Sequence, residues 1–438
     1  MPDLPSPRVR CRNVSFFVTM LMIALSTTVQ MVAAEPVVKP PRSKTDPWPQ
    51  FLGPDRNGVS RETGLLKTWP TGGPKELWRV PGGTGMSGFA IARGRALSMV
   101  QKEGQQSVVA LSAKTGKTIW QTAIGPKYGN SQGAGPRATP TVAGAMVYVF
   151  SGEGNLLALK FDDGKIVWQH KVVIELGGKP APYGMACSPL VVGDLVIVTA
   201  GAPGATVVAY DRNTGKLAWK AGGGAAGYSS PALRTIGGRQ QVIAFVGVGA
   251  MGLDPSSGKL LWKYPFKTDF DCNIATPLTY RGQVFISAAE NHGSALLSLK
   301  AADGKFDVTE TWTSFGPKSA LRSEWQTAAL VGDHLYGFDN VGSAGPITHL
   351  NCVEVATGKR VWQKTRFGKA NLIAADGKLF IITFKGELVV VTATAKGYHE
   401  LGRIKVLIGT RQAPALADGL LYLRDNREFV CLDVRETK

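Results

Sequence analysis

Side chains that could carry out chemistry gather in short segments rich in glycine and polar residues. The carboxylates of these segments are Asp269, Asp271 and Glu324. Their amide, cationic and aromatic side chains are Asn273, Arg137, Arg322, Lys369, Arg411, Tyr183, Tyr228 and Trp325. A carboxylate can act as a general acid or base, an arginine can hold an anion through two parallel hydrogen bonds, and an aromatic ring offers a stacking surface. This composition indicates a polar site for a small molecule.

Residue spacing does not indicate a metal site built from cysteine and histidine. The sequence has no C-x-x-C motif, and its five histidines are scattered. Structural zinc sites need such ligands in closely spaced pairs. We therefore expect no metal to be held by these residue types.

An eleven-residue repeat shows which elements must position the candidate side chains. It opens with a small residue, carries Gly-Lys at its seventh and eighth positions, and closes with Trp. Five copies share this register: ALSAKTGKTIW (110–120), ALKFDDGKIVW (158–168), AYDRNTGKLAW (209–219), GLDPSSGKLLW (252–262) and CVEVATGKRVW (352–362).

Three further copies are degenerate. SLKAADGKFDV opens at Ser298, and its Trp312 comes four residues late. VTATAKGYHEL (391–401) has Leu401 in the position expected for Trp, and CLDVRETK, from Cys431, contains no Trp. The complete set therefore has eight units.

The repeat predicts an all-β fold, an eight-bladed β-propeller of four-stranded antiparallel blades. A period of about 40 to 50 residues that carries only strand signals is typical of propellers. The Gly permits a tight turn between the third and outer strands, and the Trp packs between blades over the small residue. Inner strands are expected near Ser87, Ala138, Cys187, Ser229, Ala275, Gln326, Ala370 and Gln412.

Closure of the ring is predicted from an unclaimed strand near the N-terminus, KELWRV around Trp78. The last unit, from about Gln412 to Val434, lacks an outer strand of its own. A strand supplied from the N-terminal side would close the ring and leave no loose end.

Loops that lead into the inner strands should open together on one face, around the central channel. The candidate side chains lie in these loops, so we expect them to converge in one funnel. Its cationic residues outnumber its carboxylates, which favours an anionic ligand.

The repeat resembles the tryptophan-docking motif of the pyrroloquinoline quinone (PQQ) propellers. That family includes quinoprotein dehydrogenases and the lipoprotein of the outer-membrane β-barrel assembly machinery. The similarity runs from about Pro47 to the C-terminus. The segments WPQFLGPDRNGVS (48–60) and GPRATPTVAGAMVYVFSG (135–152) resemble a secreted bacterial subgroup of the family.

The resemblance to quinoproteins implies roles for the candidate residues. Asp271 or Glu324 would be the general base, and Asn273 with a neighbouring carboxylate would bind Ca²⁺. Arg137, Arg322 or Arg411 would bind the carboxylates of PQQ, and Trp325 or Tyr183 would stack on its rings. The sequence departs from the quinoprotein alcohol dehydrogenases because it has no adjacent cysteine pair, no C-x-x-C-H haem motif and a shorter chain.

Three functional hypotheses follow. The first is a non-enzymatic binding or scaffold protein that uses its funnel and rim loops to hold a small anionic ligand, a glycan or a protein. The second is a PQQ-dependent oxidoreductase similar to alcohol or sugar dehydrogenases. The third is a cofactor-free hydrolase or lyase that uses Asp269, Asp271 and Glu324. Because the repeat is structural and loops vary independently of it, we favour the first.

The N-terminal residues are expected to lie outside the propeller. Arg8, Arg10 and Arg12 precede an apolar run from Val14 to Leu25, and Val32-Ala33-Ala34 offers a cleavage site. This pattern predicts a signal peptide over residues 1–34, without a lipidated cysteine and without a membrane-spanning helix. A Pro-rich segment, 35–74, is expected to pack on the propeller (75–438) through Trp48 and Phe51. The protein should be a periplasmic or secreted monomer.

Net charge and cysteine placement complete the prediction. Loss of three Arg and one Asp with residues 1–34 lowers the formal charge from +18 to +16. Six lysines that follow the repeat glycine begin outer strands, where charge prevents edge-to-edge pairing, so nucleic acid is not an expected partner. The remaining cysteines, Cys187, Cys272, Cys352 and Cys431, are predicted to be buried free thiols, because two occupy the small position of the repeat.

Overall fold

Each regular copy of the repeat forms a hairpin between the third and outer strands of a unit. Gly116 turns the first hairpin with a φ of 70°, and Ala110 lies opposite Trp120. The corresponding pairs are Ala158 with Trp168, Ala209 with Trp219, Gly252 with Trp262 and Cys352 with Trp362. The residue opposite the indole must be small because the ring covers it: a Cβ added to Gly252 would collide with Trp262.

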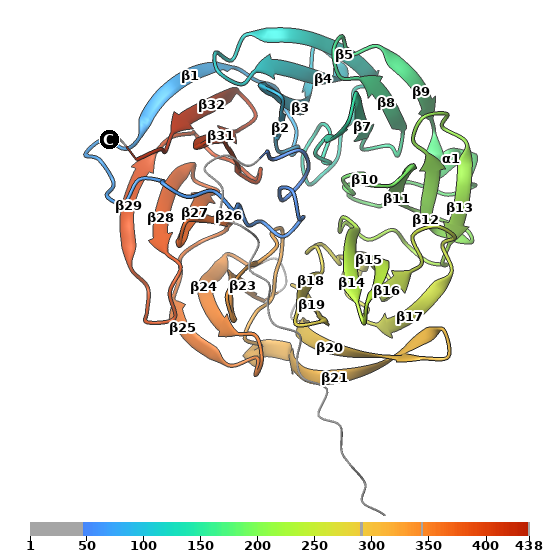
Figure 1. The fold of residues 1–438 in the computed structure, drawn as a ribbon. Coiled ribbons are helices and arrows are strands. Elements are labelled where there is room, and N and C mark those ends of the chain that lie inside the picture. Colours follow the sequence, from blue (N-terminus) through green and yellow to red (C-terminus); the bar gives the residue numbers. More distant parts are fainter. Residues whose placement is uncertain (1–46, 290–291, 343–344, 437–438) are drawn as a thin grey trace, which may run out of the picture. The chain divides into compact units, whose positions relative to one another are not determined.

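The computed structural model describes residues 47–289, 292–342 and 345–436, which all belong to one compact unit, Val38–Lys438. In this unit the chain forms eight four-stranded sheets, arranged as the blades of a propeller (Figure 1). Every pair of neighbouring strands within a blade is antiparallel. The predicted fold class is confirmed.

The first four blades follow one another along the chain. Blade 1 is β2 (Ala90–Ala92), β3 (Arg95–Lys102), β4 (Gln105–Ser112) and β5 (Thr118–Pro126). Blade 2 is β6 (Thr141–Ala143), β7 (Met146–Phe150), β8 (Leu156–Lys160) and β9 (Ile166–His170). Blade 3 is β10 (Leu190–Val192), β11 (Leu195–Ala202), β12 (Ala205–Asp211) and β13 (Leu217–Ala221). Blade 4 is β14 (Ala232–Ile236), β15 (Arg239–Val246), β16 (Gly249–Leu253) and β17 (Leu260–Pro265).

The other four blades complete the ring. Blade 5 is β18 (Leu278–Tyr280), β19 (Gln283–Ala288), β20 (Gly293–Ala302) and β21 (Lys305–Phe315). Blade 6 is β22 (Ala329–Val331), β23 (His334–Val341), β24 (Ile347–Glu354) and β25 (Arg360–Lys364). Blade 7 is β26 (Ala370–Ala375), β27 (Lys378–Thr383), β28 (Glu387–Thr392) and β29 (Glu400–Lys405). Blade 8 is β30 (Ala415–Ala417), β31 (Leu420–Arg424), β32 (Glu428–Asp433) and β1 (Lys75–Pro81).

Strand β1 closes the ring as the sequence predicts. It pairs antiparallel with β32, and Trp78 lies opposite Cys431. Figure 1 shows the blue β1 beside the red β32, so the two ends of the described chain share one sheet. Hydrogen bonds of this sheet therefore join the N-terminal strand to the last blade.

Two degenerate hairpins differ from the predicted register. In blade 5 a two-residue turn, Asp303 and Gly304, lengthens the hairpin, and Trp312 lies opposite Leu296 rather than Ser298. In blade 7 Gly402 lies opposite Val390, so the prediction that Leu401 holds the Trp position was wrong. Trp69, from the segment before β1, packs on Gly402 instead.

A segment that precedes β1 crosses the centre of the ring. Trp48 forms an antiparallel bridge to Ile91 of β2, and Val59 forms a parallel bridge to Ala374 of β26. Between these bridges, the fully buried Arg56 donates hydrogen bonds to carbonyl oxygens of Ser188, Pro189 and Pro231. These carbonyls belong to the approaches to inner strands of blades 3 and 4, so the segment closes the channel from within.

Among the described residues, helical structure is limited to single turns: α1 (Val172–Glu175) and the 3₁₀ turns Asp269–Asp271 and Gly316–Lys318. Within the described ranges, no helix has the length and apolarity needed to cross a bilayer. The predicted signal peptide lies outside the described residues.

Candidate functional site

The loops leading into the inner strands enclose a cavity of about 270 Å³ at the centre of one face of the ring. Its floor includes Phe51 and Leu52, which come from the segment that crosses the channel. All eight blades contribute to the side walls, which include Met86, Arg137, Tyr183, Ser188, Tyr228, Phe270, Ile274, Glu324, Trp325, Gln326, Asn371, Leu372 and Arg411. We call this cavity the funnel pocket.

An aromatic wall lines the funnel pocket on the side of blades 3 to 5. The rings of Tyr183 and Tyr228 stack with their centroids 5.8 Å apart, and Phe270 lies 6.2 Å from Tyr183. The backbone amide of Tyr183 donates a hydrogen bond to the Tyr228 hydroxyl at 3.3 Å. Burial raises the pKa of Tyr228 well above its usual range, so the phenol is neutral and presents an uncharged surface.

Arg137 braces this wall instead of offering a free guanidinium group. Its Nε donates to the carbonyl oxygen of Tyr183 at 2.6 Å, and its two amino nitrogens donate to the carbonyls of Gly135 and Gly133. The guanidinium also lies over the ring of Tyr128, 4.7 Å from its centroid. Desolvation lowers the pKa of Arg137. Its charge lies at the pocket lining, while each of its nitrogens is held by a backbone carbonyl.

Arg411 is an exposed cation at the opposite side of the pocket. One of its amino nitrogens donates to the carbonyl of Gln132 at 2.8 Å, and the guanidinium carbon lies 4.6 Å from the centroid of Trp325. Trp325 in turn stacks on Phe384 at 5.4 Å with an angle of 11° between the planes. Among the described residues, the Nε and the second amino group of Arg411 have no hydrogen-bond acceptor, so they can receive a ligand.

Glu324 and Lys369 form an ion pair beside Trp325. The Lys369 ammonium donates to a carboxylate oxygen of Glu324 at 2.7 Å and lies 4.6 Å from the centroid of the Trp325 ring. Glu324 lines the funnel pocket and is 6% exposed. Opposite charges at this distance largely cancel, which leaves the arginines to set the sign of the potential.

The carboxylate and amide predicted for catalysis or calcium binding lie outside the pocket lining. Asn273 is fully buried, and its amide nitrogen donates to the carbonyls of Val246 and Phe266 at 2.6 and 2.9 Å. Its amide oxygen accepts a hydrogen bond from the Thr268 hydroxyl. Asn273 therefore holds its own loop together, and neighbouring Asp271 packs against Gly247 outside the cavity.

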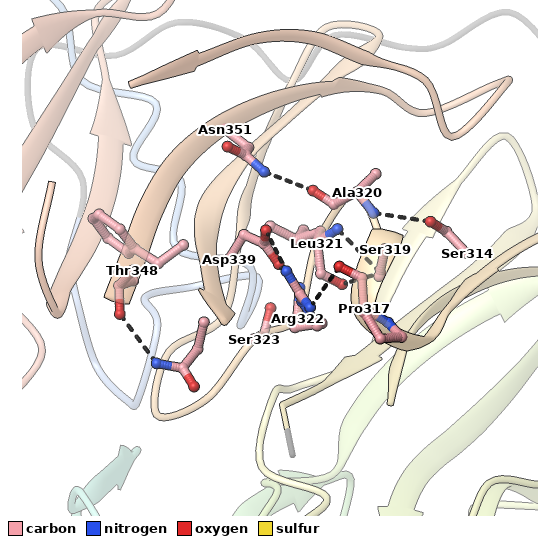
Figure 2. Close-up of polar contacts among 12 residues, drawn as sticks. Ser314, Pro317, Ser319, Ala320, Leu321, Arg322, Ser323, Asp339, Thr348 and Asn351 are labelled. Carbon is pink, nitrogen blue, oxygen red and sulfur yellow. Dashed lines mark hydrogen bonds and ion pairs between the residues drawn. The ribbon is translucent and has the colours of Figure 1, made fainter. Parts of the chain in front are cut away.

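Arg322 is also displaced from its predicted place in the funnel. Figure 2 shows its guanidinium paired with Asp339, through bonds of 2.7 and 2.9 Å. A third bond reaches the carbonyl of Pro317, and both charged side chains are almost fully buried. The sequence could not distinguish this structural pair from a ligand-binding arginine, because its partner lies on β23, 17 residues further along the chain.

Of the ten predicted site residues, the structure gathers six around the funnel pocket: Arg137, Tyr183, Tyr228, Glu324, Trp325 and Arg411. Lys369 stands behind them, paired with Glu324. Sequence reasoning missed the apolar residues of the pocket, above all Phe270, Ile274 and Leu372. Phe270 stood in a predicted loop, and an aromatic residue in a loop next to polar residues is a signal that could have identified it.

The donor set does not fit the calcium and PQQ site that the resemblance implies. Ca²⁺ takes six to eight oxygen ligands, whereas Glu324, the carboxylate of the pocket lining, is held by Lys369. No cluster of three Asp, Glu, His or Cys residues suited to a metal is present in the described part of the chain. All three guanidinium nitrogens of Arg137 are engaged with backbone carbonyls, so it is not free to turn toward a carboxylate of the cofactor.

Comparison with known proteins places the chain among propellers of different activities. It is 24% identical to tetrathionate hydrolase of Acidithiobacillus ferrooxidans over 382 residues, 69% of this chain and 72% of that protein. The quinohemoprotein alcohol dehydrogenase of Comamonas testosteroni superimposes with a TM-score of 0.64 at 15% identity, covering 90% of this chain and 82% of the other. BamB of Moraxella catarrhalis gives 0.57 at 14% identity, covering 83% and 98%.

The two superpositions show a shared fold alone, because their sequence identities are low. A family model described as outer membrane protein assembly factor BamB matches residues 104–364, which is more than half of the chain. This match runs from β4 of blade 1 to β25 of blade 6 and includes all five regular copies of the tryptophan repeat. The chain therefore belongs to the PQQ-repeat β-propeller family described by that model.

Proposed function

We propose that this protein is a non-enzymatic binding protein whose funnel pocket holds a small anionic ligand. The observation that carries the proposal is Arg411, an exposed guanidinium at the pocket wall with two donor groups directed to no protein acceptor among the described residues. Arg137 adds a second positive charge, while Glu324 is neutralised by Lys369. An anion would meet a favourable potential and a geometry suited to charge-assisted hydrogen bonds.

The proposal is tested with a panel of anions and neutral molecules. Isothermal titration would use sulfate, tetrathionate, benzoate and naphthalene-2-sulfonate, with benzamide as a neutral control. We expect at least one anion to bind, and the affinity to fall with added salt because the charges are partly exposed. Arg411→Ala should weaken binding by tenfold or more.

A matched variant tests whether the effect belongs to the pocket. Arg366 lies on the loop before β26 on the same face, but it does not line the cavity. Arg366→Ala should leave the affinity unchanged. Equal losses in the two variants, or no binding by any anion, would contradict the proposal.

Two enzymatic alternatives are tested with the same preparation. Tetrathionate is in the panel because tetrathionate hydrolase is a relative, and its consumption would be followed over hours with wild-type protein and Glu324→Gln. Dye reduction with PQQ, Ca²⁺ and an alcohol tests the oxidoreductase hypothesis. Turnover lost in Glu324→Gln, or calcium-dependent dye reduction, would replace the non-enzymatic proposal.

We further propose that the protein is exported and released after cleavage behind Ala34. The pattern of Arg8 to Ala34 supports this, and the propeller then begins after the Pro-rich segment 35–74. N-terminal sequencing of protein from the periplasm or medium should give Glu35. Recovery of uncleaved protein from the cytoplasm would contradict export.

A further inference from the structure

We infer that the ligand is flat and apolar with one anionic group, as in an aryl monocarboxylate or monosulfonate. The inference rests on the proposed function and adds to it the shape and charge of the ligand. It comes from three features of the funnel pocket: an exposed phenyl ring at its wall, an apolar floor, and one arginine with unused donors.

The exposed ring is Phe270, which is 65% exposed although it lines the pocket. Its neighbours Tyr183 and Tyr228 already stack, so Phe270 extends an aromatic surface that is open on the pocket side. Exposed phenyl groups lose stabilisation that burial would give, at roughly 25 cal/mol per Å² of apolar surface. A flat apolar ligand would recover this stabilisation and would gain the geometry of an aromatic pair.

The backbone around Phe270 is held in an uncommon conformation. Phe270 and Asp271 have φ angles of 55° and 54°, in the left-handed region that residues other than glycine rarely adopt. Asn273 anchors this turn through its bonds to the carbonyls of Val246 and Phe266. Residues kept in such conformations concentrate at ligand sites, where the surrounding structure enforces them. Here the enforced turn holds the Phe270 ring at the pocket lining, where it stays exposed.

The floor of the pocket is apolar. Phe51 and Leu52 form it from the segment that crosses the channel, and Ile274 and Leu372 join them from inner-strand approaches. Charged groups transferred to such a surface without a partner are strongly disfavoured. The body of the ligand, which enters deepest, must therefore be uncharged.

The number of anionic groups follows from the number of unused cationic donors. Each of the three guanidinium nitrogens of Arg137 already donates to a backbone carbonyl, and Lys369 is paired with Glu324. Arg411 is the arginine of the pocket lining that keeps whole nitrogens, its Nε and one amino group, with no acceptor in the described chain. One arginine can hold one carboxylate or sulfonate in bidentate fashion. A second anionic group on the ligand would reach the apolar floor.

A matched ligand series tests shape and charge separately. The probes are naphthalene-2-sulfonate, its neutral sulfonamide, inorganic sulfate and naphthalene-2,6-disulfonate, measured by isothermal titration. We expect the monosulfonate to bind at least tenfold more tightly than each of the other three. The sulfonamide lacks the negative charge, sulfate lacks the aryl group, and the disulfonate carries a second anionic group. Each of these changes should weaken binding.

Variants of the aromatic wall assign the effect to Phe270. Phe270→Ala should lower the affinity for naphthalene-2-sulfonate about tenfold and leave that for sulfate unchanged. Phe315→Ala is the matched control, because Phe315 is also an exposed phenyl group, at 48%, but does not line the pocket. Thermal melting of each variant would confirm that it is folded.

The outcomes distinguish this inference from the proposed function. If sulfate and naphthalene-2-sulfonate bind with equal affinity, or Phe270→Ala has the effect of Phe315→Ala, the ligand class is wrong while anion binding stands. If the disulfonate binds more tightly than the monosulfonate, the single anionic group is wrong. If none of the anionic probes binds, both the ligand class and the proposed function are overturned.

Discussion

The indole of Trp78 packs directly on Gly116, and this contact joins the last blade to the first. The indole nitrogen donates to the carbonyl of Ala113 at 2.9 Å, in the turn that Gly116 completes. Equivalent contacts place Trp120 on Gly164, Trp168 on Gly215, Trp219 on Gly258 and Trp312 on Gly358. The repeat glycine therefore has two functions: it turns its own hairpin and receives the tryptophan of the preceding blade.

Substitution of Gly116 by alanine should destabilise the protein more than a turn glycine normally would. A Cβ at Gly116 would lie 2.8 Å from a ring carbon of Trp78, and the φ of 70° is unfavourable for alanine. Together these effects should lower the free energy of unfolding by about 2–4 kcal/mol. Gly94→Ala is the control, because Gly94 has a φ of 73° and no heavy atom near its Cβ position. Urea denaturation giving equal losses would show that the indole contact contributes nothing.

Removal of a docking tryptophan should cost more than removal of the pocket tryptophan. Trp168 and Trp219 are buried between blades, and each donates its indole hydrogen to a carbonyl of the next blade. Trp168→Ala or Trp219→Ala should lower stability by roughly 3–5 kcal/mol. Trp325→Ala loses its stack on Phe384 and its contacts with the Lys369 and Arg411 cations, which together should contribute about 1–3 kcal/mol. Melting curves with similar losses for all three variants would contradict this ranking.

The buried pair of Arg322 and Asp339 should behave as a unit. Asp339→Leu leaves the buried Arg322 without its carboxylate and should cost about 3–5 kcal/mol. Arg322→Met leaves Asp339 with the more distant Arg360, at 3.8 Å, and should cost somewhat less. The double variant Arg322→Met/Asp339→Leu should lose less than the sum of the two single changes. A double-mutant cycle based on denaturation measures the coupling, and additive losses would mean that the pair contributes no coupling.

Alkaline stability should depend on Cys352. Cys352 is a buried cysteine that forms no disulfide, and burial raises the pKa of its thiol from 9.0 to about 11. The folded state therefore holds this proton more tightly than the unfolded state, and the resulting stability is complete below pH 9 and lost as the pH rises through about 11. Cys352→Ala should show a smaller fall of melting temperature between pH 9 and 11. Alanine fits because it occupies the same position in blades 1 to 3.

A native thiol assay gives an independent check of the same burial. Iodoacetamide at pH 8 should modify Cys352 slowly in the folded protein and rapidly in denaturant, because the thiolate is the reactive form. Rapid modification under native conditions would contradict both the burial and the raised pKa.

The fold could be predicted from the sequence because the repeat encodes it locally. Each Gly sets a turn and each small residue accommodates an indole ring, so the eleven-residue pattern specifies a hairpin without reference to the rest of the chain. The seven units with a hairpin, the last incomplete unit and the strand around Trp78 were enough to predict the number of blades and the closure. The pattern failed where the local signal changed: a two-residue turn shifted Trp312, and Trp69 replaced the missing tryptophan of blade 7.

Which polar residues face the pocket could not be predicted from the sequence, because it depends on contacts made in the folded protein. Arg322 and Arg411 have the same side chain and lie in similar loops, but Asp339 buries the first while the second remains exposed. Asn273 spends its amide on backbone carbonyls, while Phe270, three residues before it, reaches the pocket. The floor comes from Phe51 and Leu52, far away in the sequence. The role of a loop side chain depends on partners distant in the sequence, on its own blade for Arg322 and on the neighbouring blade for Asn273, and only folding brings those partners together.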